Sequence, residues 1–326
     1  GPPLSRCKLK LRELLAFMAE LDERTGYPVP APEGFASAWS AGLELPRGPS
    51  RRLLFTGALY QLTPYIHSLV ELLRLIEYPT NSSWALLRVA RDLSRTIDLS
   101  RLPVLRPDDA LLKWSNSVLR TAVRLLVRAG VDFMYVPEVS DLYSGALLRD
   151  YGLVDAFRKH ARKVLEAVRS TGAEEVIVLD PHTQDTVTNG FREAVGEGLR
   201  AVNYMDLVRP AGTGHGNAVV HDSCVYARRL GIIYRPRELL SLAGYNVIEP
   251  RRSREWTYCC GGPLEALLPS LASAIADNRA KELASFGDRV VTFCPICYLN
   301  LRRALDRIGS KARVFDILEL IGEGLE

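Results

Sequence analysis

Residues 289–297 read Arg-Val-Val-Thr-Phe-Cys-Pro-Ile-Cys, a short apolar run that ends in a C-P-x-C motif. Valine, threonine and phenylalanine favour a strand. Pro295 suits the first turn of a helix, where its missing N–H costs nothing. Backbone N–H groups at a helix start stabilise anions and lower the pKa of a thiol. The stretch therefore predicts a strand that feeds a helix, with Cys294 and Cys297 at the turn between them.

Of the four cysteines upstream of this motif, three lie in the second half of the chain. Cys224 is followed after 34 residues by the pair Cys259-Cys260, and 33 residues separate that pair from Cys294. Thiolates are soft ligands for zinc, copper(I) and iron–sulfur clusters. Five thiols from three segments predict a metal centre. Two alternatives stay open at this point: buried structural thiols, and a tetrahedral zinc site built from the C-x2-C motif and the pair.

Composition indicates an ordinary globular protein of 326 residues, long enough for two domains or one large α/β unit. The net charge of +4 is dispersed along the chain, which does not favour nucleic-acid binding. No apolar stretch reaches the roughly 18 residues that span a bilayer. The start has no signal-peptide pattern, so we expect a cytoplasmic setting with reduced thiols. Peripheral attachment to a membrane complex stays open.

The second half alternates expected strands with expected helices, which predicts parallel βαβ units. The expected strands are Asn217–His221, Tyr245–Ile248 and Arg289–Phe293. The expected helices are Tyr226–Leu242, Pro263–Ser285 and one that begins near Pro295.

The first half repeats this order without the cysteines. Residues 52–57, 129–135 and 175–183 match residues 218–223, 243–248 and 289–297, respectively. Ala58 falls where Cys224 falls, and Tyr143-Ser144-Gly145 where Cys259-Cys260-Gly261 falls. Asp180 and Thr183 take the places of Cys294 and Cys297. We predict an α/β fold of two pseudo-repeated βαβ-type domains with parallel sheets, the first lacking its cysteines.

Three segments follow from this comparison. Residues 1–50 form an N-terminal extension and connector with one helix near Lys8–Asp22. Residues 51–213 form the degenerate domain, with an insertion at 79–112, and residues 214–326 form the cysteine-bearing domain. We expect the degenerate half to act as a scaffold or docking half.

At the degenerate site we expect Asp180 or Thr183 to cap a helix start. Binding of a hard cation or a small molecule by Asp180, His182 and Thr183 stays open. We expect Cys7, outside the pattern, to be an incidental thiol.

The motifs that carry a family resemblance are His221-Asp-Ser-Cys224, Tyr234-Arg-Pro-Arg-Glu-Leu239, Cys259-Cys-Gly-Gly262 and Cys294-Pro-Ile-Cys297. They resemble the CCG (cysteine-rich) domain of iron–sulfur oxidoreductases. That family includes the B and D subunits of heterodisulfide reductase and the iron–sulfur subunits of glycolate, D-lactate and anaerobic glycerol-3-phosphate dehydrogenases. The first half looks like a second copy, so the likeness covers about residues 25 to 326.

The resemblance implies one [4Fe-4S]-type cluster, cubane or non-cubane, held by Cys224, Cys259, Cys260, Cys294 and Cys297. Family members with an upstream ferredoxin domain carry C-x2-C-x2-C-x3-C-P runs. Here the N-terminal residues hold only Cys7, so we do not expect those clusters. The implied partners are other redox subunits (a flavoprotein, a ferredoxin-like chain or a quinone-linked chain), with a disulfide or thiol as a candidate substrate.

The predicted function is an iron–sulfur electron-transfer subunit of a heterodisulfide reductase-like complex. A zinc-binding structural or assembly protein and a stand-alone thiol-disulfide reductase are the alternatives. His221 can hydrogen-bond a cluster sulfide, pass a proton or serve only a structural role. For most of the arginines near Cys224 we expect a solvated helix face; they are Arg228, Arg229, Arg235 and Arg237. No nucleotide-binding glycine motif occurs.

Overall fold

The computed structural model describes residues 3–75, 89, 91–92, 98–99 and 102–325. Most of the insertion predicted at 79–112 lies outside the described residues, as does the side chain of Cys7. Among the described helices, none combines the length and apolar character needed to cross a membrane.

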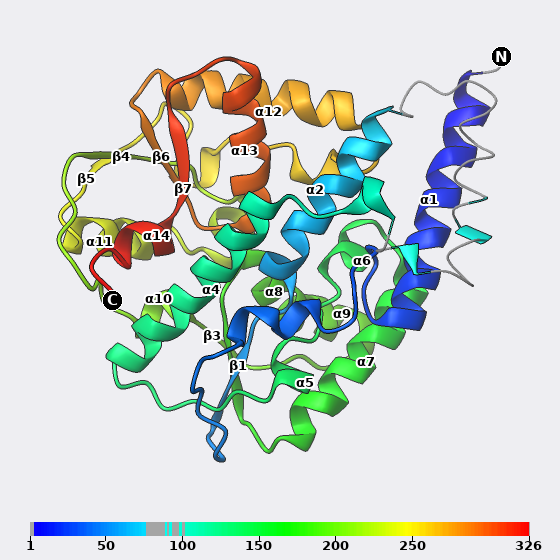
Figure 1. Cartoon of the computed structure of the whole chain (residues 1–326), viewed down its shortest axis with the longest axis horizontal. Helices are drawn as coiled ribbons and strands as arrows, with labels where there is room; N and C mark the ends of the chain where they lie inside the picture. The colour runs from blue at the N-terminus through cyan, green and yellow to red at the C-terminus, as the bar shows by residue number, and fades with distance from the viewer. Residues whose placement is uncertain (1–2, 76–88, 90, 93–97, 100–101, 326) are drawn as a thin grey trace.

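Two parallel sheets organise the described chain (Figure 1). The first has the order β1-β2-β3, with bounds Arg52–Phe55, Glu175–Val178 and Ala201–Asn203. The second has the order β5-β4-β6-β7, with bounds Asn246–Ile248, Asn217–Val220, Arg289–Thr292 and Arg313–Asp316. The α/β fold with parallel sheets is therefore confirmed.

The strands at the centre of each sheet are short apolar runs buried on both faces, as parallel sheets require. Leu53 pairs with Val176 in the first sheet, and Val219 pairs with Val290 in the second. All four side chains are fully buried. Helices then cover both faces of each sheet.

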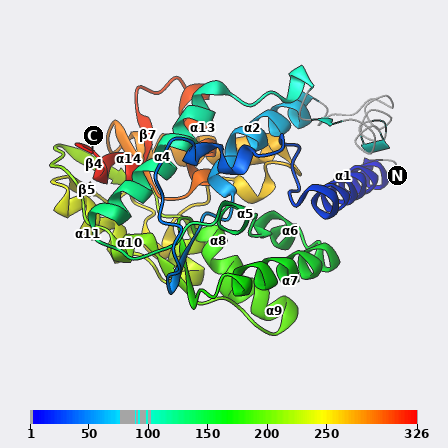
Figure 2. The ribbon, with the colours of Figure 1, turned by 60° about the horizontal axis from the view of Figure 1, so that its bottom comes forward.

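Two helical segments of the first half precede β1, and the others follow its strands. In chain order, these segments are α1 (Pro3–Thr25), η1 (Phe35–Ser40), α2 (Leu59–Leu75), η3 (Pro103–Leu105), α4 (Asp109–Arg128), α5 (Pro137–Ser140), α6 (Ala146–Asp150), α7 (Val154–Ser170), α8 (Pro181–Asp185), η4 (Thr186–Gly190), α9 (Phe191–Val195) and α10 (Tyr204–Leu207). Figure 2 shows α1 at one end of the molecule, away from the second sheet.

The second half has fewer helical segments, and they begin directly after its strands and turns. They are η5 (Val225–Leu230), α11 (Tyr234–Leu242), η6 (Arg254–Trp256), η7 (Gly262–Leu264), α12 (Pro269–Ala284), α13 (Pro295–Arg307) and α14 (Ile317–Ile321).

Two predicted helices differ from the structure. The single helix expected over 226–242 is wrong, because Gly231 adopts φ +68° and separates a wide π-helical turn, η5, from α11. The helix expected from Pro263 begins at Pro269 instead, after the short turn η7. Proline at the first helical position suits either start, so the sequence pattern alone does not separate them.

Residues 129–135 correspond to the segment that ends in β5, but in the structure they form only an isolated bridge. Only Met134 bridges β1, through Leu54 N–H donating to Met134 O and Met134 N–H donating to Arg52 O. This bridge lies beside β1 as β5 lies beside β4. The two halves therefore share one strand order, although the first half has lost most of its edge strand.

The two halves pack through helices α2 and α4 of the first against α13 and α14 of the second (Figure 1). Trp114 stacks on Tyr298 with ring centroids 3.7 Å apart and donates from Nε1 to Glu319 Oε2. Tyr60 OH donates to Asp316 Oδ2 at 2.7 Å. Aromatic burial of this kind gives a large apolar contact with a few directional bonds.

Asp316 makes the stability of this interface depend on pH. It is fully buried, and burial raises the pKa of Asp316 to about 8. An unfolded aspartate titrates near 3.9, so between about pH 4 and 8 the folded state binds more protons and stability falls as pH rises. We expect Asp316→Asn to remove this dependence, so that its gain over the wild type rises from near zero at about pH 4 to roughly 3–4 kcal/mol at about pH 6–7.

Urea unfolding of both proteins at several pH values in this range measures the difference. Asp306→Asn, at an exposed position near the end of α13, is the matched control and should follow the wild type. Parallel profiles for Asp316→Asn and the wild type would contradict the prediction.

Candidate metal centre

The sheet order places three segments at one edge. Parallel strands β5, β4 and β6 lie side by side, so the segments that follow them emerge together at their carboxyl ends. Cys294 caps the start of α13 directly after β6. Cys224 comes at the start of η5, four residues beyond the end of β4. The pair Cys259-Cys260 follows β5.

The structure brings all five predicted cysteines into one connected group, and all are free. Thiol–thiol hydrogen bonds link Cys224 to Cys259, Cys259 to Cys260, Cys260 to Cys297 and Cys297 to Cys294. Cys224 and Cys259 are half-buried, whereas the other three are buried. The group therefore has an open edge and an enclosed side.

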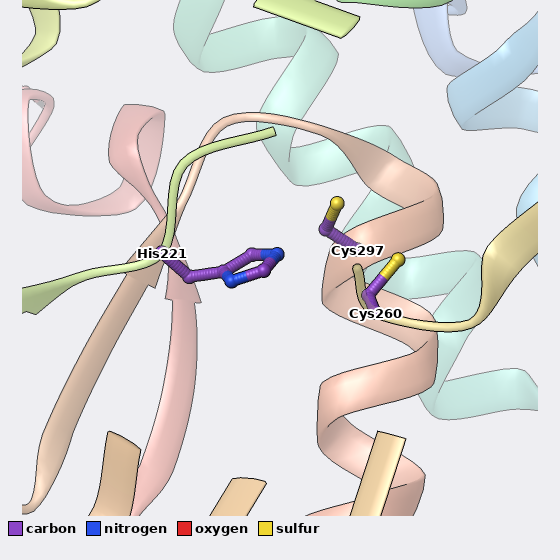
Figure 3. Close-up of side chains that lie close together, drawn as sticks. All are labelled: His221, Cys260 and Cys297. Atoms are coloured by element: carbon purple, nitrogen blue, oxygen red, sulfur yellow. The ribbon is translucent and has the colours of Figure 1, made fainter. Parts of the chain in front are cut away.

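His221 lies against the enclosed side (Figure 3). One ring nitrogen of His221 and the sulfur atoms of Cys260 and Cys297 all lie within 4.8 Å of one another. In Figure 3 the imidazole points from the end of β4 toward both thiols. A histidine with two cysteines at this spacing is a typical metal-binding arrangement.

The hydrogen bonding of His221 defines its tautomer. Arg279 Nε donates to His221 Nδ1 at 3.1 Å, so Nδ1 is the acceptor. Burial and the Arg279 charge hold the pKa of His221 well below its usual value, so the ring is neutral. The ring proton is therefore on Nε2. That buried N–H has no partner among the described residues.

The unpartnered N–H and the five thiols together fit a missing sulfur-rich group. A buried donor without an acceptor carries a free-energy cost, and an inorganic sulfide or a thiolate beside it removes that cost. The donor set is also soft, as iron–sulfur clusters require.

The five thiols differ in the direction in which their pKa values are shifted. Hydrogen bonds from Cys224 and Cys260 lower the pKa of Cys259 to about 2. Burial opposes ionisation of Cys294, but a hydrogen bond from Cys297 and the His182 charge hold its pKa well below normal. Hydrogen bonds to the Cys259 thiolate raise the pKa of Cys224 and Cys260, and hydrogen bonds to Cys260 and to the Cys294 thiolate raise the pKa of Cys297. Binding a metal centre through all five thiolates would therefore release protons.

The arginines near Cys224 all make structural contacts. The expected solvated helix face holds for the exposed Arg228 and Arg229, but not for the half-buried Arg235 or the buried Arg237. Arg237 is buried and binds Asp222 and Glu249, each through two hydrogen bonds of 2.6–2.9 Å. Arg235 donates to the carbonyls of Met205 and Val208. The partners of the other two follow the same pattern: Arg229 binds Asp185, and Arg228 donates to the carbonyls of Glu255 and Thr257.

The degenerate site is filled by its own side chains. Asp180 caps α8 by accepting from Thr183 N–H at 2.9 Å, which confirms the expected helix cap. Ala58, Ser144 and Thr183 are fully buried, and Thr183 packs so closely on Gly57 that a side chain there would overlap it.

His182 makes a contact with the cysteine site that the sequence did not predict. It comes from the degenerate half, yet it hydrogen-bonds Cys294 in the other half. Burial opposes its charge, but the Cys294 thiolate and the Asp150 carboxylate raise the pKa of His182 well above normal. Its position within Asp180-Pro-His-Thr183 gave a local reason for interest but no indication of which surface it faces.

Comparison with known proteins agrees with this geometry. Residues 218–302 match the family model of the cysteine-rich CCG domain. This segment is similar to CCG domains. It contains all five clustered cysteines and His221, so the resemblance stated from the motifs is confirmed.

Several curated proteins are similar over a larger part of the chain. The D subunit of dihydromethanophenazine:CoB–CoM heterodisulfide reductase from Methanosarcina barkeri is 28% identical over 62% of this chain and 54% of its own length. EtfAB:quinone oxidoreductase of Syntrophomonas wolfei is 26% identical over 63% of this chain and 31% of its own. The B subunit of fumarate reductase (CoM/CoB) from Methanothermobacter marburgensis is 30% identical over 31% of this chain and 21% of its own. The chain thus spans about half the length of the first of these relatives, and less of the others.

Gly261 fixes the turn that presents the cysteine pair. It has φ +87°, and a Cβ there would lie 2.5 Å from the backbone oxygen of Ala272. We expect Gly261→Ala to lower the free energy of unfolding by at least about 2 kcal/mol more than Gly309→Ala. Gly309 also has positive φ, +63°, but nothing lies within 4 Å of its added Cβ.

Urea unfolding of the two variants separates backbone strain, which both share, from the clash at Gly261 alone. Equal losses would show that the contact with Ala272 does not constrain the turn.

Proposed function

We propose that this chain is an iron–sulfur electron-transfer subunit of an oxidoreductase complex, with a single [4Fe-4S]-type cluster on its five clustered cysteines. The observation that carries the proposal is the convergence of these thiols with the unpartnered Nε2–H of His221. The relatives support it, because they are named as oxidoreductase components. The proposed ligands are Cys224, Cys259, Cys260, Cys294 and Cys297.

The number of thiols favours a cluster over structural zinc. Tetrahedral zinc takes four ligands. A site with five connected thiols and a further N–H donor exceeds that need, whereas a cluster offers several irons and sulfides to bind. Cubane and non-cubane arrangements both remain compatible with five thiolates.

When bound, the cluster would supply reversible one-electron transfer. The residues of this chain would set its potential and its access, since hydrogen bonds to sulfur, nearby charge and solvent exposure tune such centres. His221 would donate from Nε2 on the enclosed side, and His182 would donate to Cys294. The half-buried Cys224 and Cys259 would form the edge through which electrons pass.

The open edge also supports a second candidate, a heterodisulfide reductase-like activity on a disulfide or thiol substrate. A flavoprotein, a ferredoxin-like chain or a quinone-linked chain would exchange electrons with the cluster as a further subunit. Five free thiols suit a reducing compartment, so we propose a cytoplasmic location, with attachment to a membrane complex through a partner.

Iron and acid-labile sulfide content of anaerobically purified protein tests the proposal, together with EPR of the oxidised and reduced forms. We expect about four iron and four sulfide per chain. One zinc with no sulfide, even after attempted cluster reconstitution, would overturn the proposal in favour of a structural site.

The difference between the halves provides a matched pair of variants. Cys260→Ser should lose most of the iron, because it removes the thiol that joins Cys259 to Cys297. Ser144→Ala, at the corresponding place in the degenerate half, should retain wild-type iron. Equal iron in both variants would contradict the assignment of the cluster to the second half.

Removal of the His221 donor should lower the midpoint potential. A hydrogen bond to sulfur favours the more negative, reduced state, so we expect His221→Leu to shift the potential down by roughly 50 mV. His221→Gln retains an amide that can accept from Arg279 and donate into the site. The midpoint potential of this variant should therefore lie close to that of the wild type. Redox titration followed by EPR measures both, and unchanged potentials in His221→Leu would contradict the donor role.

A further inference from the structure

An exposed basic and aromatic segment leads directly into the cysteine pair. Arg251, Arg252 and Arg254 are exposed, and so are 69% of Trp256 and 50% of Tyr258. Residues 249 and 251–256 line an open cleft of about 570 Å³. Tyr258 is followed by Cys259, one of the two half-buried thiols. We call Arg251, Arg252, Arg254, Trp256 and Tyr258 the arginine–aromatic face.

The charge of this face is positive. Residues 249–258 contain two carboxylates, and Glu249 is already bound by the buried Arg237 at 2.6 and 2.8 Å. The Arg252 backbone N–H donates to Glu282 Oε1 at 2.9 Å, but among the described residues the guanidinium groups of Arg251 and Arg252 form no ion pair with a carboxylate. Arg252 instead lies over the ring of Tyr258, 5.0 Å from its centroid. Two guanidinium groups therefore remain available to an anionic partner.

The face is held in place by the turn that carries Cys224. Arg254 N–H donates to Asp222 Oδ2 at 2.6 Å, and Thr257 Oγ1 donates to the carbonyl of Asp222 at 3.0 Å. Arg228 Nε donates to the carbonyl of Glu255 at 2.9 Å. Arg254 adopts φ +57°, a strained value for a non-glycine residue that such contacts must maintain. A segment fixed in this way loses little entropy when a partner binds.

We propose that the arginine–aromatic face docks an acidic electron-transfer protein over the Cys224–Cys259 edge. Arginine and aromatic side chains dominate the energetic centres of interfaces, and a positive face accelerates association with an acidic partner. One electron leaves the reduced centre of the partner and enters the oxidised cluster, with no bond made or broken. The electron step rests on the proposed function, whereas the docking itself requires only the face.

A second basic cleft supplies the matched control. It has a volume of about 450 Å³, and its lining includes Arg289, Lys311 and Arg313. Arg289 and Arg313 begin β6 and β7, so this cleft lies at the amino ends of the strands, opposite the cysteines. Arg251→Glu/Arg252→Glu and Lys311→Glu/Arg313→Glu change the net charge equally at the two ends of one sheet.

The probe is a reduced plant-type [2Fe–2S] ferredoxin, an acidic one-electron donor. Stopped-flow absorbance would follow reduction of the reconstituted cluster at increasing salt. We expect Arg251→Glu/Arg252→Glu to slow the second-order rate at least about tenfold at low salt and to flatten its salt dependence. Lys311→Glu/Arg313→Glu should stay within about threefold of the wild type. Equal rates in the two variants would overturn the proposal.

Binding of oxidised ferredoxin to cluster-free protein, measured by biolayer interferometry, tests the face independently of the cluster. Weaker binding in Arg251→Glu/Arg252→Glu alone supports the docking face, even where no iron can be loaded and the proposed function fails. Equal affinity of the two variants overturns the docking face, even where the cluster assembles and is redox-active.

Discussion

The parallel alignment of β5, β4 and β6 is the constraint on which the cysteine site depends. More than thirty residues separate the cysteines of one segment from those of the next, and only a common sheet edge brings these segments together. The pairing of Val219 with Val290, and of Ala218 with Val247, fixes where each strand ends. A slip of one residue would turn alternate side chains to the opposite face and move the turns that carry the thiols.

The same frame in the first half carries different chemistry. Its strand order repeats, and Asp180 caps α8 where Cys294 caps α13. Ala58, Ser144 and Thr183 fill the place of the thiols, while Tyr60 contributes to the contact between the halves. The degenerate copy thus packs against the second half and supplies His182 to its site.

Local patterns predicted the strands, the turn at Cys294 and the five clustered cysteines, because each depends on a few adjacent residues. Long-range contacts could not be predicted in this way. The sequence around Arg237 predicts a solvated helix face, and only the fold brings Asp222 and Glu249 to its guanidinium group. His182 faces Cys294 only because the two halves pack together. Gly231 is a local signal for the break between η5 and α11, since a glycine at the end of a helical turn often adopts positive φ.

The site combines protection on one side with access on the other. Cys260, Cys294 and Cys297 are buried beside His221 and the fully buried Arg279, so charge placed there is stabilised by fixed donors rather than by water. Cys224 and Cys259 are half-buried. Asp222 joins these features, since it binds the buried Arg237 and also anchors the exposed segment at Arg254. The contacts that position the Cys224 turn therefore also position the surface that a partner would meet, which couples cluster geometry to partner access.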